Sequence, residues 1–447
     1  MESNTNGKHV VVVGAGLAGL EAARRLVLAG LGVTLIEREA RIGGRAITAY
    51  VEGLEMDQGA QFISAFYHET LGLISELGLH EDLVYRSQTA SVLRGGRIRG
   101  IWPPQVLYRD HAISALTKLR LLGILPGLVW HWRHLDIADL GRSVVLGDLP
   151  AAKYLSSVVG NEALEYFFAP LVRGLLYWDI EGTSKEVLLS ILKAFATEGK
   201  ACRLRGGMSS LTAAMCRGES MIEHDLAVQS VRISATGEIE VLGVQNGVKR
   251  EFAADAAVIA TTADAASEMC SWLSPEAKGF LSSVAYSKTT VITYEVDNTK
   301  DYPSGVILFS TEEVADLASV NPFEGSTSNG RRMLRVFLSD TGMDEYGSLG
   351  DDEMATIVLD RIRALIGRKD WMARAECAHV KRWQMALPKY EAGYVNKVLA
   401  FREAVSARPM VVFAGDYLDG PYVDGAIRSG AKAAETLIAR VVHIGGT

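Results

Sequence analysis

The sequence of 447 residues predicts an α/β fold built from two domains that are interleaved along the chain. Three observations predict this fold class. Residues 9–36 have the pattern of a strand, a glycine-rich turn, a helix and a second strand, which typically opens a parallel sheet. Strand patterns return at 221–260 after a mainly helical stretch at 67–197. A strand and a helix at 409–441 then close the sequence, and strands at 289–339 belong to the other domain.

The first turn has the spacing of a dinucleotide site. Gly14-x-Gly16-x-x-Gly19 follows the strand His9–Val13 and opens the helix Leu17–Ala29. The first glycine permits the tight turn, the second lets a pyrophosphate approach the backbone, and the third lets helix and strand pack closely. Unpaired N–H groups at the start of the helix favour phosphate. These features predict a Rossmann-like nucleotide-binding site.

Glu37 ends the second strand, Gly32–Ile36. At this spacing a carboxylate accepts hydrogen bonds from both ribose hydroxyls, and its charge disfavours a 2′-phosphate. The sequence therefore predicts FAD or NAD as the ligand and argues against NADP. An NAD-dependent dehydrogenase would need only this motif, so the rest of the chain decides between the two cofactors.

Composition limits the classes of partner and compartment. The net charge of -7 and pI of about 5.8 argue against nucleic acid, which needs clustered Lys and Arg. The four cysteines are scattered without metal-ligand spacing, as expected for free thiols in a reducing compartment. The polar residues 1–8 give no secretory signal, and no window has about 18 uninterrupted apolar residues. We expect a cytoplasmic protein without a membrane span or a metal.

Further glycine-rich motifs lie at both ends and in the middle of the chain. Arg41-Ile-Gly43-Gly44-Arg45 and Asp57-Gln58-Gly59-Ala60-Gln61-Phe62 follow the βαβ unit, and Leu204-Arg205-Gly206-Gly207-Met208 lies near the centre. Phe413-Ala414-Gly415-Asp416 ends a strand before the helix opened by residues 420–430. With these motifs the chain resembles the flavin amine oxidase superfamily, which includes monoamine and polyamine oxidases, protoporphyrinogen oxidases and carotenoid-type desaturases.

The resemblance implies a Rossmann-like FAD-binding domain of the GR2 type, formed by residues 1–82, 200–284 and 400–447. An α+β substrate domain is formed by 83–199 and 285–399. Asp416 would hold a ribityl hydroxyl, and the start of the last helix would face the pyrimidine edge, where its dipole stabilises the reduced flavin. The implied cofactor-binding residues are Gly14, Gly16, Leu17, Ala18, Gly19, Glu37, Arg38, Gly43, Gly44, Arg45, Gly59, Ala60, Gln61, Phe62, Val228, Gly415, Asp416, Tyr422, Val423 and Ala426.

The same resemblance supplies candidates on the substrate side. Tyr422 aligns with one wall of the aromatic cage of amine oxidases, and Tyr390 or Tyr394 is expected to form the other wall with Trp383 nearby. Amine oxidases also place a Lys near the flavin, for which Lys288 is the candidate. The alignment puts Thr290, on the same strand face, at that position. No Cys follows Cys377, so the FAD is expected to be noncovalent.

The predicted function is two-electron oxidation of a small-molecule substrate by hydride transfer to FAD, at a carbon next to nitrogen, with molecular oxygen as acceptor. The alternative within the enzyme class is C–C dehydrogenation of an isoprenoid or porphyrinogen. A catalytically idle flavin-binding protein is the alternative of another class.

The most apolar stretch of the chain is residues 119–132. It is predicted to form a buried helix pair in the substrate domain. A peripheral membrane contact and a homodimer face stay open as alternatives for this stretch.

Overall fold

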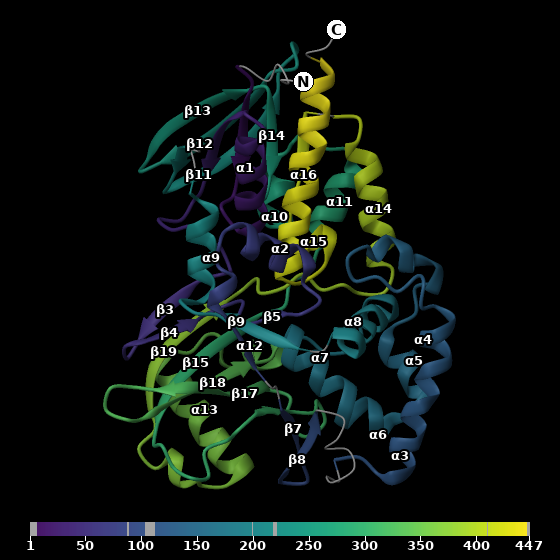
Figure 1. Cartoon of the computed structure of the whole chain (residues 1–447), viewed down its shortest axis with the longest axis vertical. Helices are drawn as coiled ribbons and strands as arrows, with labels where there is room; N and C mark the ends of the chain where they lie inside the picture. The colour runs from purple at the N-terminus through teal and green to yellow at the C-terminus, as the bar shows by residue number, and fades with distance from the viewer. Residues whose placement is uncertain are drawn as a thin grey trace.

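The computed structural model describes residues 7–86, 89–102, 112–198, 200–217, 221–408 and 410–444. Two sheets organise these residues, one in the upper and one in the lower half of Figure 1, with a group of helices beside the lower sheet. Both ends of the chain lie at the top, next to the upper sheet. Residue 409, the first of the predicted last strand, lies outside the described residues, as do residues 1–6 of the polar N-terminal stretch.

The upper sheet is parallel, with the strand order β10-β2-β1-β14-β20. The chain supplies these strands from three distant segments, as the sequence predicts, and β20 pairs with β14 across more than 150 intervening residues. The strands are β1 (His9–Val13), β2 (Gly32–Ile36), β10 (Met221–Glu223), β14 (Ala256–Ile259) and β20 (Val411–Phe413). The predicted α/β fold class is confirmed.

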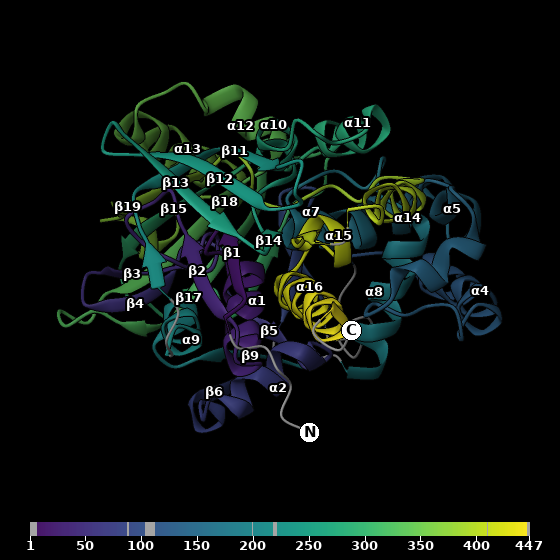
Figure 2. The same cartoon turned by 90° about the horizontal axis from the view of Figure 1, so that it is seen from above.

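Both faces of this sheet are covered, which is why its strands are mainly apolar. Val10 and Val12 of β1 face the helices α1 (Leu17–Leu28) and α16 (Val423–Ile444). Val11 and Val13 face the opposite side, where the antiparallel sheet of β11 (Leu226–Ile233), β12 (Ile239–Gln245) and β13 (Val248–Ala254) packs. Figure 2 shows this order of layers from above.

The lower sheet is mainly antiparallel, with the order β19-β15-β18-β17-β16-β7-β8. One face packs on α12 (Asp340–Tyr346) and α13 (Asp351–Ile366), and the other faces the upper domain. The strands are β7 (Ala90–Arg94), β8 (Arg97–Trp102), β15 (Thr289–Val296), β16 (Val306–Leu308), β17 (Leu317–Ser326), β18 (Arg332–Leu338) and β19 (Glu376–Trp383).

A group of helices completes the lower half. It comprises α3 (Ala115–Arg120), α4 (Leu125–Trp130), α5 (Ala151–Val158), α6 (Asn161–Ala163), the π-helical turn η5 (Leu164–Phe168), α7 (Ala169–Leu176) and α8 (Lys185–Glu198). Short strands join the halves: β3 (Thr48–Val51) with β4 (Leu54–Asp57), and β9 (Ala201–Leu204) with β5 (Ile63–Ser64) and β6 (Leu83–Arg86). The other helices are α2 (His68–Glu76), α9 (Gly207–Met215), α10 (Ala263–Met269), α11 (Pro275–Ser283), α14 (Tyr394–Val405) and α15 (Asp416–Asp419).

This connectivity supports the division into two interleaved domains, with one change of boundary. The expected boundary at residue 400 falls inside α14, whose Tyr394, Val395 and Val398 share a core with the upper sheet. We therefore propose that the final cofactor-domain segment begins before Tyr394.

The stretch 67–197 is mainly helical, as predicted, but it also contains a hairpin of β7 and β8 around Gly95 and Gly96, whose φ values of 59° and 69° suit a tight turn. One expectation about the lower half is wrong. The apolar stretch 119–132 is not a buried helix pair. Ile124 and Leu128 are buried, but most of the large side chains of this stretch are exposed, and Trp130 is 84% exposed. In the described part of the chain, no helix combines the length and apolar character needed to cross a bilayer.

Candidate active site

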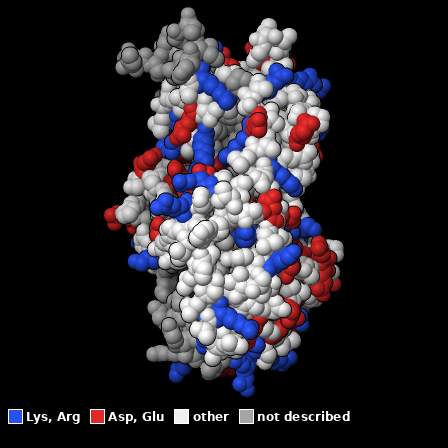
Figure 3. All heavy atoms as spheres, turned by 90° about the vertical axis from the view of Figure 1, so that its right-hand side faces the viewer, with Lys and Arg blue, Asp and Glu red and all other residues white. Residues whose placement is uncertain are grey.

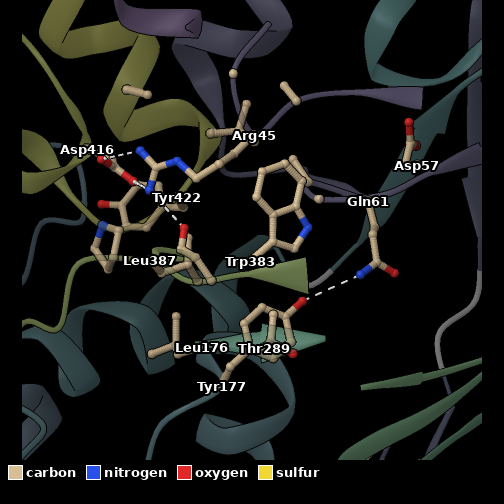
Figure 4. Close-up of a pocket in the computed structure, with 18 of the residues that line it drawn as sticks. Arg45, Asp57, Gln61, Leu176, Tyr177, Thr289, Trp383, Leu387, Asp416 and Tyr422 are labelled. Atoms are coloured by element: carbon tan, nitrogen blue, oxygen red, sulfur yellow. Dashed lines mark hydrogen bonds and ion pairs between the residues drawn. The ribbon is translucent and has the colours of Figure 1, made fainter. Parts of the chain in front are cut away.

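One cavity of about 1200 Å³ runs between the two halves of the molecule. Its walls come from both ends and the middle of the chain, including β1, β2, β11, α7, α8, β18 and the start of α16. Pockets for one drug-sized ligand measure about 300–1000 Å³, so this cavity is larger than one such ligand needs. The close-up in Figure 4 shows its central part.

The glycine turn after β1 leaves a gap at one end of the cavity. A Cβ on Gly19 would lie 1.8 Å from the carbonyl oxygen of Gly14, so this glycine allows α1 to pack against the turn. A Cβ on Gly16 would meet nothing within 4 Å, although Gly16 lines the cavity. Gly16 is the N-cap of α1 and no side chain caps this helix. The first turn of α1 therefore presents its N–H groups to open space, which suits an anion.

Glu37 lies beside this turn, at the end of β2. Its carboxylate accepts hydrogen bonds from the backbone N–H of Ala15 at 2.8 Å and of Glu39 at 3.0 Å. These bonds hold an almost buried carboxylate, 9% exposed, at the wall of the cavity. A hydroxyl pair on a ligand could donate to it from the cavity side.

The segment Gly43–Arg45 runs along the glycine turn. Gly43 and Gly44 have φ values of 99° and 55°, which favour glycine, and a Cβ on Gly44 would lie 3.3 Å from Cα of Gly16. Arg45 then forms a two-pronged ion pair with Asp416, with both N–O distances 2.9 Å, and also donates to the carbonyl oxygen of Ala386. This pair joins the N-terminal and C-terminal motifs in the cavity wall (Figure 4).

The C-terminal helix α16 begins at the wall of the same cavity. Gly430 packs on α1, since a Cβ there would lie 2.1 Å from the carbonyl oxygen of Ala18. The first residues of α16, Val423 and Ala426, line the cavity beside Gly415 and Asp416. The start of this helix therefore faces the cavity, and its partial positive charge favours an anionic group there.

Almost all the cofactor residues expected from the sequence line this one cavity. Gly19 does not, because it lies in the contact between α1 and the turn. The residues that line it are Gly14, Gly16, Leu17, Ala18, Glu37, Arg38, Gly43, Gly44, Arg45, Gly59, Ala60, Gln61, Phe62, Val228, Gly415, Asp416, Tyr422, Val423 and Ala426.

Two of the four residues expected on the substrate side also line the cavity. Tyr422 stacks on Tyr67, with ring centroids 5.6 Å apart and planes 18° from parallel, and its hydroxyl donates to the carbonyl oxygen of Ile137. The indole N–H of Trp383 donates to the carbonyl oxygen of Gln58 at 2.7 Å. These bonds fix both rings, so their faces form rigid walls.

Tyr390 is not a cage wall, which corrects the expectation. It is 1% exposed and does not line the cavity, because its hydroxyl connects two backbone groups. It donates to the carbonyl oxygen of Asp416 at 2.7 Å and accepts from the N–H of Gly420 at 2.8 Å. Tyr394 is also buried, and its hydroxyl donates to the carbonyl oxygen of Tyr417. Both tyrosines support the Asp416–Gly420 turn from behind.

Lys288 does not reach the cavity either. Its ammonium group pairs with the exposed Asp344 at 2.9 Å, and the hydroxyl of Thr290 lies against the sulfur of Met343. The side chains of Thr289 and Val291 line the cavity instead. The expectation assigned Lys288 and Thr290 to the cavity face of the strand, whereas the structure places Thr289 and Val291 there. Successive side chains of a strand point to opposite faces, so an error of one residue exchanges the two faces.

The structure adds Tyr177, which the sequence does not indicate. Tyr177 ends α7 with φ 67° and stacks on Phe337, with centroids 5.7 Å apart, while Gln61 lies 3.5 Å from its hydroxyl. Burial raises the pKa of Tyr177 to about 12, so the phenol is neutral at physiological pH. A left-handed residue other than glycine is rare and has no reliable signal in a single sequence.

Comparison with known proteins agrees with this geometry. The family model for flavin-containing amine oxidoreductases matches residues 17–438. Protoporphyrinogen oxidase 2 of Arabidopsis thaliana is 22% identical over 97% of this chain and 94% of its own length. Putrescine oxidase of Kocuria rosea is 48% identical, but over only 34% of this chain and 30% of its own.

A solved structure shows the same fold. It is a provisionally named protoporphyrinogen oxidase from Exiguobacterium sp. 255-15, with a TM-score of 0.79 and 19% identity over 98% of this chain and 100% of that one. The matched family model covers most of the chain, and the FAD cofactor and oxidoreductase class expected from the sequence are confirmed. The chain belongs to the flavin-containing amine oxidoreductase family and is an FAD-dependent oxidoreductase.

Proposed function

We propose that the chain removes two hydrogen atoms from a bulky, mainly apolar substrate such as a porphyrinogen, with noncovalent FAD and molecular oxygen as acceptor. The observation that carries this proposal is the shape of the lower half of the cavity. Leu188, Ile191, Leu192 and Phe195 of α8 lie at i, i+3, i+4 and i+7 and line the cavity. Phe168, Leu171, Val172 and Leu175 repeat this spacing along η5 and α7.

These two apolar stripes form one chamber, which we call the α7–α8 chamber. A small diamine would leave most of its wall uncovered, whereas a large apolar body would cover the wall and displace water from it. The missing second cage wall also argues against an amine box, because Tyr390 is buried behind the Asp416 turn. The relative from Arabidopsis that matches the whole chain carries the name of a porphyrinogen oxidase.

The cofactor fits the upper part of the cavity. The open space at Gly16 suits the pyrophosphate, Glu37 the ribose hydroxyls and Asp416 a ribityl hydroxyl. When bound, FAD supplies the two-electron acceptor. The chain's own contribution is to position the substrate C–H bond and exclude water, with Trp383, Tyr177 and Tyr422 as fixed walls.

A small amine is the second candidate, supported by the local 48% match to putrescine oxidase. The test is anaerobic mixing of the purified yellow protein with a porphyrinogen, and separately with putrescine and cyclohexylamine, while flavin absorbance is followed. We expect the porphyrinogen to bleach the flavin and the amines to leave it oxidised. Bleaching by the amines alone would overturn the proposal.

A matched variant tests the role of the α7–α8 chamber. Leu192→Trp fills part of the chamber with a larger side chain. It should slow bleaching by the porphyrinogen about 10-fold or more, since overpacking costs about 1–3 kcal/mol, and it should leave FAD content unchanged. Equal rates in Leu192→Trp and wild type would place the substrate elsewhere.

We also propose that α3 and α4 contact a membrane surface. The α3–α4 patch consists of exposed Leu116, Leu119, Leu122, Leu125, Val129, Trp130 and Trp132. Residues 112–135 contain no acidic residue but include Lys118, Arg120 and Arg133. Apolar side chains with Trp and basic neighbours suit an anionic bilayer. Figure 3 shows the side of the molecule that carries these helices, with wide uncharged areas between isolated charges.

A further inference from the structure

Three arginines line the cavity on the side of the lower sheet. Arg203 comes from β9, and Arg332 and Arg335 come from β18. Arg203 and Arg332 have no ion pair with any carboxylate of the described residues, and the Nε–H of each is buried without an acceptor there. A buried N–H group without an acceptor costs free energy, even though Asp57 is close enough to Arg203 for their charges to interact. This cost points to a ligand that supplies the missing acceptor.

The three guanidinium groups lie over two aromatic rings, Phe323 and Tyr302. Arg203 and Arg335 lie 5.8 and 5.4 Å from the ring centre of Phe323, and Arg332 lies 4.6 Å from that of Tyr302. Cation–π contacts hold the groups in place, and Arg332 also donates to the carbonyl oxygen of Phe323 at 3.4 Å. The remaining N–H groups of Arg203 and Arg332 can bind an acid. Arg335 also donates to the carbonyl oxygen of Asp57 at 3.2 Å.

Two carboxylates of the chain line the same region, and both have other partners. Asp57 accepts from the Thr48 hydroxyl at 2.7 Å and from the N–H of Met208 at 2.8 Å. Glu55 accepts from the Tyr50 hydroxyl at 2.7 Å. Three guanidinium groups and two carboxylates leave this region with one positive charge in excess.

The arginines are set apart from the proposed phosphate position. The open space for a pyrophosphate lies at Gly16, next to Gly44. Asp57, which marks the arginine region, lies on the other side of Trp383 from the Arg45–Asp416 pair (Figure 4). An anion at the arginines therefore belongs to a second molecule in the cavity.

We propose that Arg203, Arg332 and Arg335 form a subsite for a carboxylate of the substrate. This inference rests on the proposed function and narrows the class of substrate to molecules with a carboxylate. The substrate is an amphiphile, whose apolar body occupies the α7–α8 chamber and whose carboxylate pairs with the arginine forks. Its orientation over the cofactor is then set at two points, one apolar and one ionic.

The test compares 1-pyrenebutyrate with 1-pyrenebutanol, which share an apolar body and differ in the carboxylate. Binding to the FAD-loaded protein is measured by pyrene fluorescence at about 0.15 M salt, where exposed charges are largely screened. We expect the butyrate to bind at least about 10-fold more tightly, and Arg203→Gln and Arg332→Gln each to reduce this preference about 10-fold. Arg368→Gln, in an exposed loop, is the control for net charge.

Equal binding of the two probes by wild type would overturn the proposal, as would an unchanged preference in both cavity variants. Arg203→Lys keeps the charge and serves if Arg203→Gln does not fold. The probe experiment measures binding and not turnover. A preference for 1-pyrenebutyrate would therefore remain valid even if a porphyrinogen failed to bleach the flavin. Bleaching by porphyrinogens together with equal probe binding would reject the carboxylate subsite alone.

Discussion

Arg45 and Asp416 are 371 residues apart in the chain and form a two-pronged ion pair with N–O distances of 2.9 Å. Asp416 is 7% exposed at its side chain and Arg45 31%. The pair closes the cavity where the first and last motifs meet. We therefore propose that it links cofactor binding to the docking of the C-terminal segment on the rest of the domain.

Asp416→Asn should weaken this link. A hydrogen bond between charged groups contributes about 1.5–3 kcal/mol, so we expect FAD affinity to fall about 10- to 100-fold. Flavin released on gel filtration and titration of the apoprotein with FAD measure the change. Asp360→Asn, which breaks an exposed pair with Arg363, is the control. Unchanged FAD retention in Asp416→Asn would contradict the proposed role.

Glu37→Gln tests the other end of the cofactor. Glu37 is placed to meet the ribose of the adenosine half, so the loss of its charge should lower FAD affinity about 10-fold or more. Affinity for FMN, which lacks the adenosine half, should not change. Titration of both flavins into the apoprotein distinguishes a loss at the adenosine half from a general loss of flavin binding. Glu238→Gln, an exposed position away from the cavity, is the control. An equal loss of affinity for FMN would show that Glu37 does not act on the adenosine half of FAD.

Lys288→Met tests the corrected face of β15. Lys288 pairs with Asp344 outside the cavity, so its removal should change flavin reduction and reoxidation by no more than about 2-fold, as for other surface substitutions. Stopped-flow absorbance measures both steps. Thr289→Leu is the matched change on the cavity face, where it should slow reduction. A large loss of reoxidation rate in Lys288→Met would restore the lysine to the site.

The α3–α4 patch makes a prediction for vesicles. Wild type should sediment with vesicles that contain phosphatidylglycerol and stay in solution with pure phosphatidylcholine. The triple variant L119S/V129S/W130S should bind about 10- to 100-fold less, because three exposed apolar side chains are lost. Val248→Ser, at an equally exposed site on β13, should bind normally. A dimer in light scattering that this triple variant disrupts would show that a second copy covers the patch.

Glu162 accepts hydrogen bonds from Arg94 of β7 and from Ser114 at the start of α3. Its titration should make the stability of α3 depend on pH. Burial raises its pKa, but hydrogen bonds from Ser114, Thr117 and Arg94 outweigh burial and lower the pKa to about 2. The folded value is below the ordinary value of 4.5, so the contribution is present above pH 4.5 and is lost as pH falls towards 2. Glu162→Gln should therefore destabilise α3 by about 1–2 kcal/mol at pH 7.

Hydrogen exchange of α3 in wild type and Glu162→Gln, followed from pH 7 to pH 3, measures this difference. The two proteins should converge as pH falls below 4.5. A constant difference over that range would show that the hydrogen bonds of Glu162 do not depend on its charge.

The residues of the proposed cofactor site could be predicted from the sequence because short local motifs determine their geometry. Gly14 and Gly19 each have a separate steric reason to be glycine, Gly16 leaves open space beside the turn, and the spacing to Glu37 follows from a single βαβ unit. The C-terminal motif could be placed beside them since Asp416 follows a strand of the same sheet.

The substrate half could not be predicted in the same way, because its residues meet through long-range packing. Thr289 and Lys288 differ by one position, and only the pairing of β15 with β18 and β19 decides which faces the cavity. Tyr390 sits two residues after a proline in a loop whose path the sequence does not fix. The arginines of β9 and β18 carry no motif at all and meet only in the folded chain.

The place of β20 at the edge of the upper sheet also affects how the protein is made. During synthesis β14 leaves the ribosome more than 150 residues before β20, and until then its outer edge has no partner. Asp416 and α16 leave the ribosome at the same late stage. We therefore expect FAD to bind only after synthesis is complete, and a nascent chain that stalls before Val411 to need protection by chaperones.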